Sequence, residues 1–368
     1  MLGVVEEMFI RLSFKSKDYI ISKRNYLCDY SKIESKKIDM TLSGKYLATY
    51  PKHEPIEVLF DTYPSHETQK ELECLLREEY RIKDRIILGS GSNGLLQNIV
   101  KLFFIDKGNL VTPYYVFNQV EYAVTSFGGY TKRVFSKNYD IDFEKLYNSI
   151  DKKTRMVYIT NPCNPTGLYI EPNKVLEFAK KVKIPVIIDE SSIEFACSKS
   201  ILDIVEHLPD NLIIVRSFSK AFGLANLRIG YLICSEKIEE LYIKNITTNE
   251  YSDVSCRMAI ICMHNIEFMK KNIEKINDEK EYLISELNKV GINCLKSFSN
   301  ILFTKTIFDI NFINKLSEND ISVVPVYDKD NNLHIRIAVQ DRKTNDLFLK
   351  NIKKVLKSSD LIKGEYSD

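Results

Sequence analysis

The sequence predicts an α/β protein with two domains. Its 368 residues are enough for two domains and a sizeable core. Apolar runs rich in β-branched residues at 186–188 and 212–215 are typical of buried strands, whereas the spacing of leucines over 67–80 is typical of a helix. In the last third of the chain, β-rich runs such as 321–326 and 333–339 accompany helical patterns, which predicts a smaller α+β domain.

Composition and charge are those of an ordinary soluble protein. Hydrophobic residues make up 44% and charged residues 28% of the chain, which argues against disorder. With 52 basic and 50 acidic residues the net charge is +2, so we expect neither nucleic acid nor an acidic membrane as a partner. No apolar run is long enough to span a membrane.

The eight cysteines and five histidines predict neither disulfides nor a metal site. The cysteines are scattered without a C-x-x-C pair, and the histidines lack the spacing of metal ligands. The chain also lacks the pattern of a signal peptide. We therefore expect free thiols in the reducing cytoplasm.

The chain divides into three ranges. Residues 1–50 are mixed and lysine-rich, and we expect an N-terminal arm that joins the small domain. Residues 51–255 form the predicted large domain, and residues 256–368 form the predicted C-terminal small domain. A helical pattern over 266–290 combines apolar positions with many charges, which predicts a surface helix that bridges the domains.

A lysine that follows a buried strand is the centre of the predicted site. Residues 217–231 read S-F-S-K-A-F-G-L-A-N-L-R-I-G-Y, in which the lysine is Lys220. Partial burial disfavours the ammonium form, so the amine becomes a nucleophile. Ser217, Ser219 and Arg228 offer hydroxyl groups and a planar cation, which suit a phosphate. An amine beside a phosphate site is what pyridoxal 5'-phosphate (PLP) requires, because its aldehyde forms a Schiff base with lysine. For a lone S-x-S-K, a surface lysine in a loop is the alternative.

A glycine-rich loop predicts a second part of the phosphate site. The apolar run 86–88 is followed by G-S-G-S-N-G at 89–94 and then by an amphipathic helical pattern. Glycine allows close backbone approach, and the first N–H groups of a helix point at an anion. A tight turn without a ligand is the alternative. The candidate residues are Ser90, Gly91, Ser92 and Asn93.

Two further strand ends carry polar residues. Asp189 ends the apolar run 185–188, where a carboxylate is costly unless it is paired. The protonated pyridine nitrogen of PLP is a suitable partner, since its proton makes the ring a better electron acceptor. The strand pattern over 156–160 ends in N-P-C-N-P-T-G at 161–167, a rigid turn that either holds a ligand or serves only as a turn.

These strings together resemble the class I/II PLP-dependent aminotransferases of fold type I. The chain is most similar to the branch that contains histidinol-phosphate aminotransferases and threonine-phosphate decarboxylases, and the motifs occur in the family's order from about Tyr63 onward. The resemblance implies a large domain with a mixed, mostly parallel seven-stranded sheet. It also implies a smaller α+β domain, PLP as cofactor, and a homodimer with active sites at the subunit boundary.

The resemblance assigns roles around the cofactor. It implies that Lys220 binds PLP and later removes the substrate's α-proton, and that Asp189 bonds the ring nitrogen. It implies that Tyr115 stacks on the ring, with the alternative that Tyr114 and Tyr115 are both core residues. It also implies that Asn164, before a cis Pro165, bonds the ring oxygen. The implied cofactor-binding residues are Ser90, Gly91, Ser92, Asn93, Tyr115, Asn164, Asp189, Ser192, Ser217, Ser219, Lys220, Arg228 and, from the neighbouring subunit, Tyr63.

The resemblance also implies a substrate site. Arg336, in the pattern H-I-R-I-A-V-Q, matches an arginine that clamps the substrate carboxylate, and Asn164 lies beside it. Arg342 follows shortly after and is a candidate for a second anion contact, as in threonine-phosphate decarboxylases.

The chain departs from the family at three places. Residues 40–46 read M-T-L-S-G-K-Y where the family carries Asn-Glu-Asn-Pro and places substrate contacts. Ser192 replaces a tyrosine that bonds the ring oxygen. Gln340 stands where the decarboxylases carry a second arginine in R-x-A-V-R.

We therefore predict a PLP-dependent aminotransferase that acts on an amino acid or an amino-alcohol phosphate, with histidinol phosphate as the default substrate by resemblance. Its partners would be a small amino donor and a keto acceptor. A PLP-dependent decarboxylase of the threonine-phosphate type is the first alternative, since orientation of the substrate decides which α-bond breaks. A regulator that binds PLP without turnover is the second, although such proteins usually carry a DNA-binding domain and none is visible in the sequence.

Overall fold

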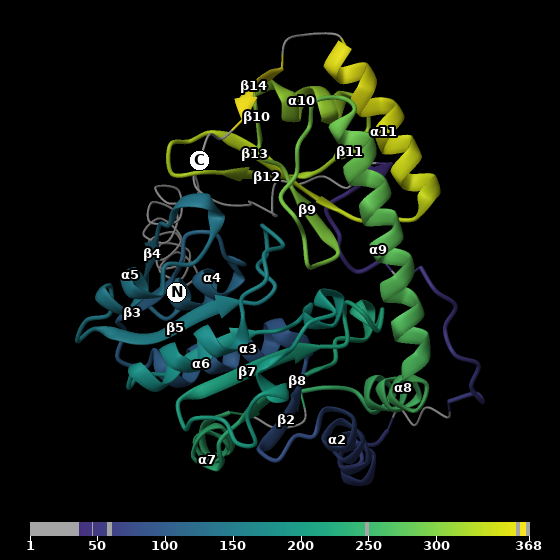
Figure 1. Ribbon diagram of the computed structural model, residues 1–368. Helices are drawn as coiled ribbons and strands as arrows, with labels where there is room; N and C mark the ends of the chain where they lie inside the picture. Colours follow the sequence, from purple (N-terminus) through teal and green to yellow (C-terminus); the bar gives the residue numbers. More distant parts are fainter. Residues whose placement is uncertain (1–36, 46, 57–60, 247–249, 358–360, 366–368) are drawn as a thin grey trace, which may run out of the picture.

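Two larger β-sheets, a two-stranded sheet and the helices that cover them make up the described part of the protein (Figure 1). The computed structural model describes residues 37–45, 47–56, 61–246, 250–357 and 361–365. Within these ranges the larger sheet has seven strands and the smaller has five. None of the helices in these ranges is long and apolar enough to cross a membrane.

The larger sheet is mixed and mostly parallel, as the resemblance implied. Every strand runs in the same direction except β8, which is antiparallel to both of its neighbours. The strands, in their order across the sheet, are β2 (Arg85–Gly89), β8 (Gly230–Cys234), β7 (Leu212–Ser217), β6 (Val186–Asp189), β5 (Thr154–Thr160), β3 (Asn109–Pro113) and β4 (Tyr130–Val134).

Helices cover both faces of this sheet, which explains why its central strands are apolar on both sides. Successive side chains of a strand point to opposite faces. Ile187 and Ile213 therefore pack in one core, whereas Ile188 and Ile214 pack in the other. The first core is closed by α3 (Gly91–Phe103), α4 (Gln119–Ser126) and α7 (Glu236–Asn245). The second is closed by α2 (His66–Tyr80), α5 (Phe143–Asn148), α6 (Pro172–Lys181) and α8 (Asp253–His264).

The smaller sheet is antiparallel and lies above the larger one in Figure 1. Its strands are β9 (Ile301–Phe303), β10 (Thr306–Phe308), β12 (Val324–Tyr327), β13 (Leu333–Ala338) and β14 (Ile362–Glu365). The helices α10 (Asn311–Glu318) and α11 (Arg342–Lys357) accompany it. The N-terminal strand β1 (Ile38–Asp39) pairs in parallel with β11 (Ile321–Ser322), so the first described residues belong to this part.

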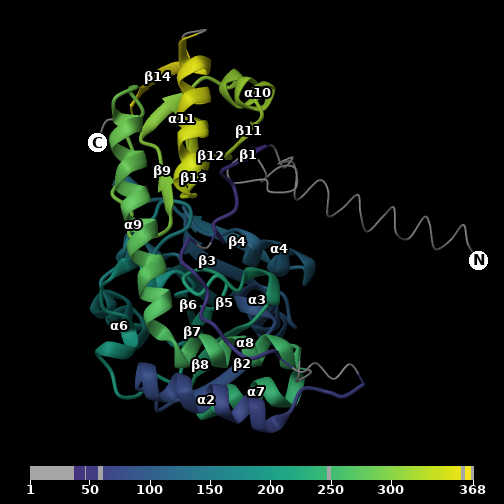
Figure 2. The same cartoon turned by 90° about the vertical axis from the view of Figure 1, so that its right-hand side faces the viewer.

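The long helix α9 (Ile266–Asn288) runs along the side of both parts, as Figures 1 and 2 show. It contacts α8 at one end and α11 at the other. The helix α8 packs against α2 beneath the larger sheet, so the larger part continues past the domain boundary predicted at residue 255.

Candidate active site

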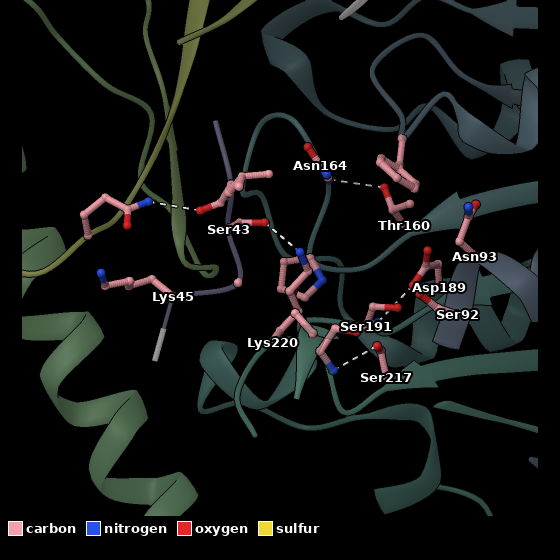
Figure 3. A pocket seen from close by; sticks show the side chains of 18 of the residues that line it. Ser43, Lys45, Ser92, Asn93, Thr160, Asn164, Asp189, Ser191, Ser217 and Lys220 are labelled. Atoms are coloured by element: carbon pink, nitrogen blue, oxygen red, sulfur yellow. Dashed lines mark hydrogen bonds between the residues drawn. The ribbon is translucent and has the colours of Figure 1, made fainter. Parts of the chain in front are cut away.

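The candidate site lies where three parallel strands end. Thr160 of β5, Asp189 of β6 and Ser217 of β7 are the last residues of neighbouring strands, so their side chains meet at one edge of the sheet. Ligands of open α/β sheets bind at this edge. A cavity of about 640 Å³ opens here (Figure 3). Besides these strand ends, its wall includes the N-terminal segment 42–45 and the start of α3.

Lys220 lies in this cavity, three residues after β7, and is partly buried. Its Nζ donates a hydrogen bond to the Oγ of Ser43 over 2.7 Å. The pKa of Lys220 is lowered to about 8, mainly by burial and also by the nearby charges of Arg336 and Arg228, while Asp189 acts in the opposite direction. A neutral, nucleophilic amine is therefore more accessible at Lys220 than at an exposed lysine.

Asp189 is only 7% exposed and faces the same cavity. The hydroxyl of Tyr158 and the backbone N–H of Ser191 each donate a hydrogen bond to its carboxylate over 2.9 Å. Burial raises the pKa of Asp189, while these bonds and the charge of Lys220 act in the opposite direction. The carboxylate is thus held in one orientation next to a cationic partner.

An anion site is formed by Arg228 and the first turn of α3. Gly91 has φ +67°, and a Cβ there would lie 2.6 Å from Nη2 of Arg228, so only glycine lets the guanidinium lie this close to the helix start. The N–H groups of a first helical turn have no partner within the helix. Asn93 lines the cavity beside them, and the N–H₂ group of its side-chain amide is a further donor. This donor set suits a phosphate.

Serine hydroxyls complete this anion site. Ser217 and Ser219 are both buried and line the cavity. The hydroxyl of Ser217 accepts from the N–H of Ser219 over 3.0 Å, and Nη1 of Arg228 donates to Oγ of Ser219 over 3.3 Å. Of the predicted glycine-rich loop, Ser92 and Asn93 line the cavity, whereas Ser90 and Gly91 lie directly before them at the start of α3.

Asn164 and Arg336 meet from the two parts of the protein. Asn164 lines the cavity, and the peptide bond to Pro165 is cis, as the resemblance implied; the bond between Asn161 and Pro162 is also cis. Arg336 is 2% exposed on the central strand β13. Its Nη1 donates to Oδ1 of Asn164 over 3.4 Å, and its Nη2 donates to the carbonyl oxygen of Thr41.

Tyr115 does not line the cavity, and its stacking on the cofactor ring stays a prediction. Its ring is buried against Tyr114, Tyr139 and Phe303, with centroids 5.0, 5.2 and 5.8 Å away. Phe303 belongs to the smaller sheet, so Tyr115 is held at the contact between the two parts of the protein. Phe117, two residues further on, lines the cavity instead.

Arg342 is also placed differently from its prediction. It is the first residue of α11 and is 53% exposed. Its Nε donates to the carboxylate of Glu279 over 2.9 Å, and its guanidinium lies 3.8 Å from the ring centroid of Tyr282. A guanidinium held on the surface of α9 in this way does not reach the cavity, and the predicted role in substrate binding is withdrawn. Gln340 lines the cavity.

The other predicted residues are placed as follows. Ser192 lines the cavity. Tyr63 is 91% exposed and lies outside the cavity; its predicted role concerns a second subunit and stays a prediction.

Five further residues at the site were not predicted from the sequence: Ser43, Lys45, Phe117, Tyr158 and Ser191. For Ser43 and Lys45 a signal existed, because the family places substrate contacts at residues 40–46.

Known proteins are similar to this chain over most of its length. The family described as "Aminotransferase class I and II" matches residues 57–352. A histidinol-phosphate aminotransferase of Archaeoglobus fulgidus is 30% identical over 279 residues, which cover 74% of this chain and 84% of that protein. One of Carboxydothermus hydrogenoformans is 29% identical over 235 residues, and the match covers 61% of this chain and 63% of the relative, less than two thirds of its length.

A solved structure shows the same fold. The histidinol-phosphate aminotransferase of Sinorhizobium meliloti, in complex with pyridoxal 5'-phosphate, superposes with a TM-score of 0.72 at 23% identity. The superposition covers 81% of this chain and 83% of that one.

Proposed function

Because the chain belongs to the family of class I and II aminotransferases, we propose that its cavity holds PLP and transfers amino groups of an amino acid or an amino-alcohol phosphate. Histidinol phosphate is the proposed amino donor, since the relatives described above carry that name. The observation that carries the proposal is the meeting of three groups in one cavity: the amine of Lys220, the buried carboxylate of Asp189 and the anion site around Arg228.

The residues of the cavity fit PLP. Arg228, the N–H groups at the start of α3 and the hydroxyl groups of Ser217 and Ser219 would bind the phosphate. Asp189 would keep a proton on the ring nitrogen, and Lys220 would bind the aldehyde carbon. Phe117 would lie against the ring. When bound, PLP supplies an electron sink for the pair released at the substrate's α-carbon.

The chain's own residues would position the substrate and move one proton. Arg336 would bind the substrate carboxylate, with Asn164 beside it. The neutral amine of Lys220 would remove the proton from the α-carbon as a general base, and its ammonium form would return that proton in the later step. Burial lowers the pKa of Lys220 to about 8, which brings a sufficient fraction of the neutral amine near neutral pH.

Replacement of Lys220 tests this proposal. Lys220→Ala should abolish both turnover and the visible absorbance that PLP gains on binding to a lysine amine. Lys181→Ala is a matched control, because Lys181 lies on α6 in a surface pair with Glu144. Retention of both signals in Lys220→Ala would refute the assignment.

An amino-donor panel tests the substrate. Histidinol phosphate, aromatic amino acids and O-phosphothreonine would each be offered with a keto acceptor, followed by cofactor absorbance and by release of carbon dioxide. The decarboxylase alternative was motivated by a second arginine in contact with the substrate. The cavity wall carries Gln340 at that place, and Arg342 lies on the surface. We therefore expect transamination, and carbon dioxide from O-phosphothreonine without amino transfer would contradict it. Absence of turnover with every donor despite PLP binding would favour the regulator alternative.

We also propose a cytoplasmic homodimer in which Tyr63 of one subunit reaches the phosphate site of the other. The support is the family resemblance together with the 91% exposure of Tyr63, which is unusual for a large aromatic side chain. Light scattering should give twice the chain mass of 42.7 kDa. A Tyr63→Ala variant should then weaken PLP binding, although Tyr63 lies outside the cavity of its own chain.

A further inference from the structure

A short N-terminal segment, residues 40–43, crosses the cavity with its backbone bound on one side by the smaller part of the protein. We call this segment the strap. The carbonyl oxygens of all four strap residues accept hydrogen bonds. The donors are the N–H of Ala338 to Met40 (2.8 Å), the guanidinium of Arg336 to Thr41, the side-chain amide of Gln340 to Leu42 (3.0 Å) and that of Asn300 to Ser43 (2.5 Å).

The two amide donors are themselves fixed. Asn300 is 2% exposed and Gln340 is 5% exposed. The side chain of Asn345 bonds both the N–H and the carbonyl oxygen of Gln340, over 3.2 and 2.7 Å. The same side chain donates to Glu279, the carboxylate that also holds Arg342. A buried network of this kind leaves the strap little freedom to shift.

The strap places one hydroxyl on the amine of Lys220. Ser43 is 8% exposed, and its Oγ accepts from Nζ of Lys220 over 2.7 Å, as Figure 3 shows. The charged groups that influence Lys220 are Asp189 from β6, Arg336 from β13 and Arg228. The hydroxyl of Ser43 is therefore an uncharged hydrogen-bond acceptor for the amine of Lys220, whose other neighbours named here are charged.

We propose that Ser43 is a positioning residue for Lys220 and that Asn300 and Gln340 act through the strap to place it. This rests on the proposed function, in which Lys220 is the base. When the neutral amine of Lys220 donates one N–H to Ser43, its lone pair points away from Ser43. The lone pair is then directed at a substrate in the cavity. Ser43 and Gln340, which both depart from the family pattern, then act together. The side-chain amide of Gln340 bonds the carbonyl oxygen of Leu42, which directly precedes Ser43.

The titration of Lys220 in the full chain freed of PLP tests this inference. Trace labelling of amines with acetic anhydride at several pH values, followed by mass spectrometry of the Lys220 peptide, measures the pKa of that amine. Ser43 bonds the ammonium form more strongly than the amine, so Ser43→Ala should lower this pKa by about one unit. Ser43→Thr should restore it. Thr344→Val, which removes a hydroxyl from the same cavity that bonds Asp341 and not Lys220, should leave this pKa unchanged.

A double-mutant cycle separates positioning from general loosening of the fold. Gln340→Ala should also lower the pKa of Lys220 when Ser43 is present, because the strap loses one bond, and should have no effect on it in the Ser43→Ala background. Additive effects of the two changes, or a pKa in Ser43→Ala equal to that of the unmodified chain, would overturn the inference.

Kinetics of the PLP-loaded enzyme supply a second readout. Ser43→Ala should lower kcat about tenfold with little change in KM, since it disturbs the base and leaves the substrate contacts in place. The proposed function is checked separately by adding PLP, which should protect Lys220 from labelling. Lack of protection would refute the proposed function, whereas protection with an unchanged titration in Ser43→Ala would refute only the role of Ser43.

Discussion

The hydroxyl of Tyr158 donates a hydrogen bond to the carboxylate of Asp189 over 2.9 Å. The two residues come from adjacent parallel strands, and both are buried. Burial raises the pKa of Asp189, and the bond from Tyr158 partly offsets this effect. Tyr158 thereby helps to keep Asp189 ionised and pointed at the cavity.

Tyr158→Phe removes this bond without changing the shape of the ring. A hydrogen bond to a charged partner is worth about 1.5–3 kcal/mol, so we expect kcat/KM to fall about tenfold or more and the pKa of Asp189 to rise. A pH profile of kcat/KM measures both. An unchanged profile would mean that the N–H of Ser191 alone holds the carboxylate.

Lys220→Met should stabilise the PLP-free protein. The pKa of Lys220 is about 8 in the folded chain and 10.5 in its unperturbed state, so the folded chain loses its proton first as the pH rises. Below pH 8 the buried ammonium costs stability, and this cost disappears as the pH rises from about 8 to 10.5. We expect a gain in unfolding free energy of about 1–3 kcal/mol at pH 7.

Urea unfolding at pH 7 and pH 9.5 measures this gain, which should shrink by more than half at the higher pH. Lys181→Met, on the exposed surface of α6, should show no such pH dependence. A gain that is equal at both pH values would contradict a titration of Lys220 in this window.

Gly91→Ala should weaken PLP binding. A Cβ at this position would lie 2.6 Å from Nη2 of Arg228, and φ +67° adds backbone strain. We expect the Kd for PLP, measured by absorbance titration, to rise at least tenfold. Gly291→Ala is the matched control, because Gly291 also has positive φ while a Cβ there would meet only Ile362, 3.7 Å away. Loss of stability in both variants, with loss of affinity only in Gly91→Ala, is the expected pattern.

Phe117 and Tyr115 can be separated by their alanine variants. Phe117 lines the cavity, so Phe117→Ala should raise the Kd for PLP and shift its absorbance. Tyr115 packs in the buried aromatic cluster, so Tyr115→Ala should lower the unfolding free energy by about 3–5 kcal/mol. Urea unfolding and PLP titration of both variants decide the matter. A larger loss of PLP affinity in Tyr115→Ala at unchanged stability would support the stacking role predicted for Tyr115.

The alanine variants of Arg336 and Arg342 should differ in their effect on KM for the amino donor. Arg336→Ala removes the proposed carboxylate clamp and should raise KM for the amino donor by about a hundredfold, since a bonded charge pair contributes roughly 1.5–3 kcal/mol. Arg342→Ala removes a surface pair with Glu279 and should change KM less than threefold. Steady-state kinetics with the best donor of the panel measures both. Equal effects would return Arg342 to the substrate site.

Short motifs could be interpreted from the sequence alone because neighbouring residues determine the local structure that each motif adopts. The apolar runs before Asp189 and Lys220 predict buried strands, and in a parallel sheet the ends of such strands meet at one edge. The Asn-Pro loop that carries Asn164 and the glycine-rich start of α3 are local in the same sense. For these reasons the family, the cofactor and the larger sheet followed from the order of the motifs.

Contacts between distant segments were decided only by the tertiary structure. Ser43 bonds Lys220 across 177 positions of the chain, and Gln340 bonds Leu42 across 298. Tyr115 and Phe117 are similar in type and two positions apart, and only the packing of Phe303 on Tyr115 shows which ring is left for the cavity. The guanidinium of Arg342 lies on the surface, where it donates a hydrogen bond to the carboxylate of Glu279 on α9. Local residue patterns specify strands, turns and helix starts, whereas the approach of the two sheets, which no short pattern contains, determines which side chains share the cavity.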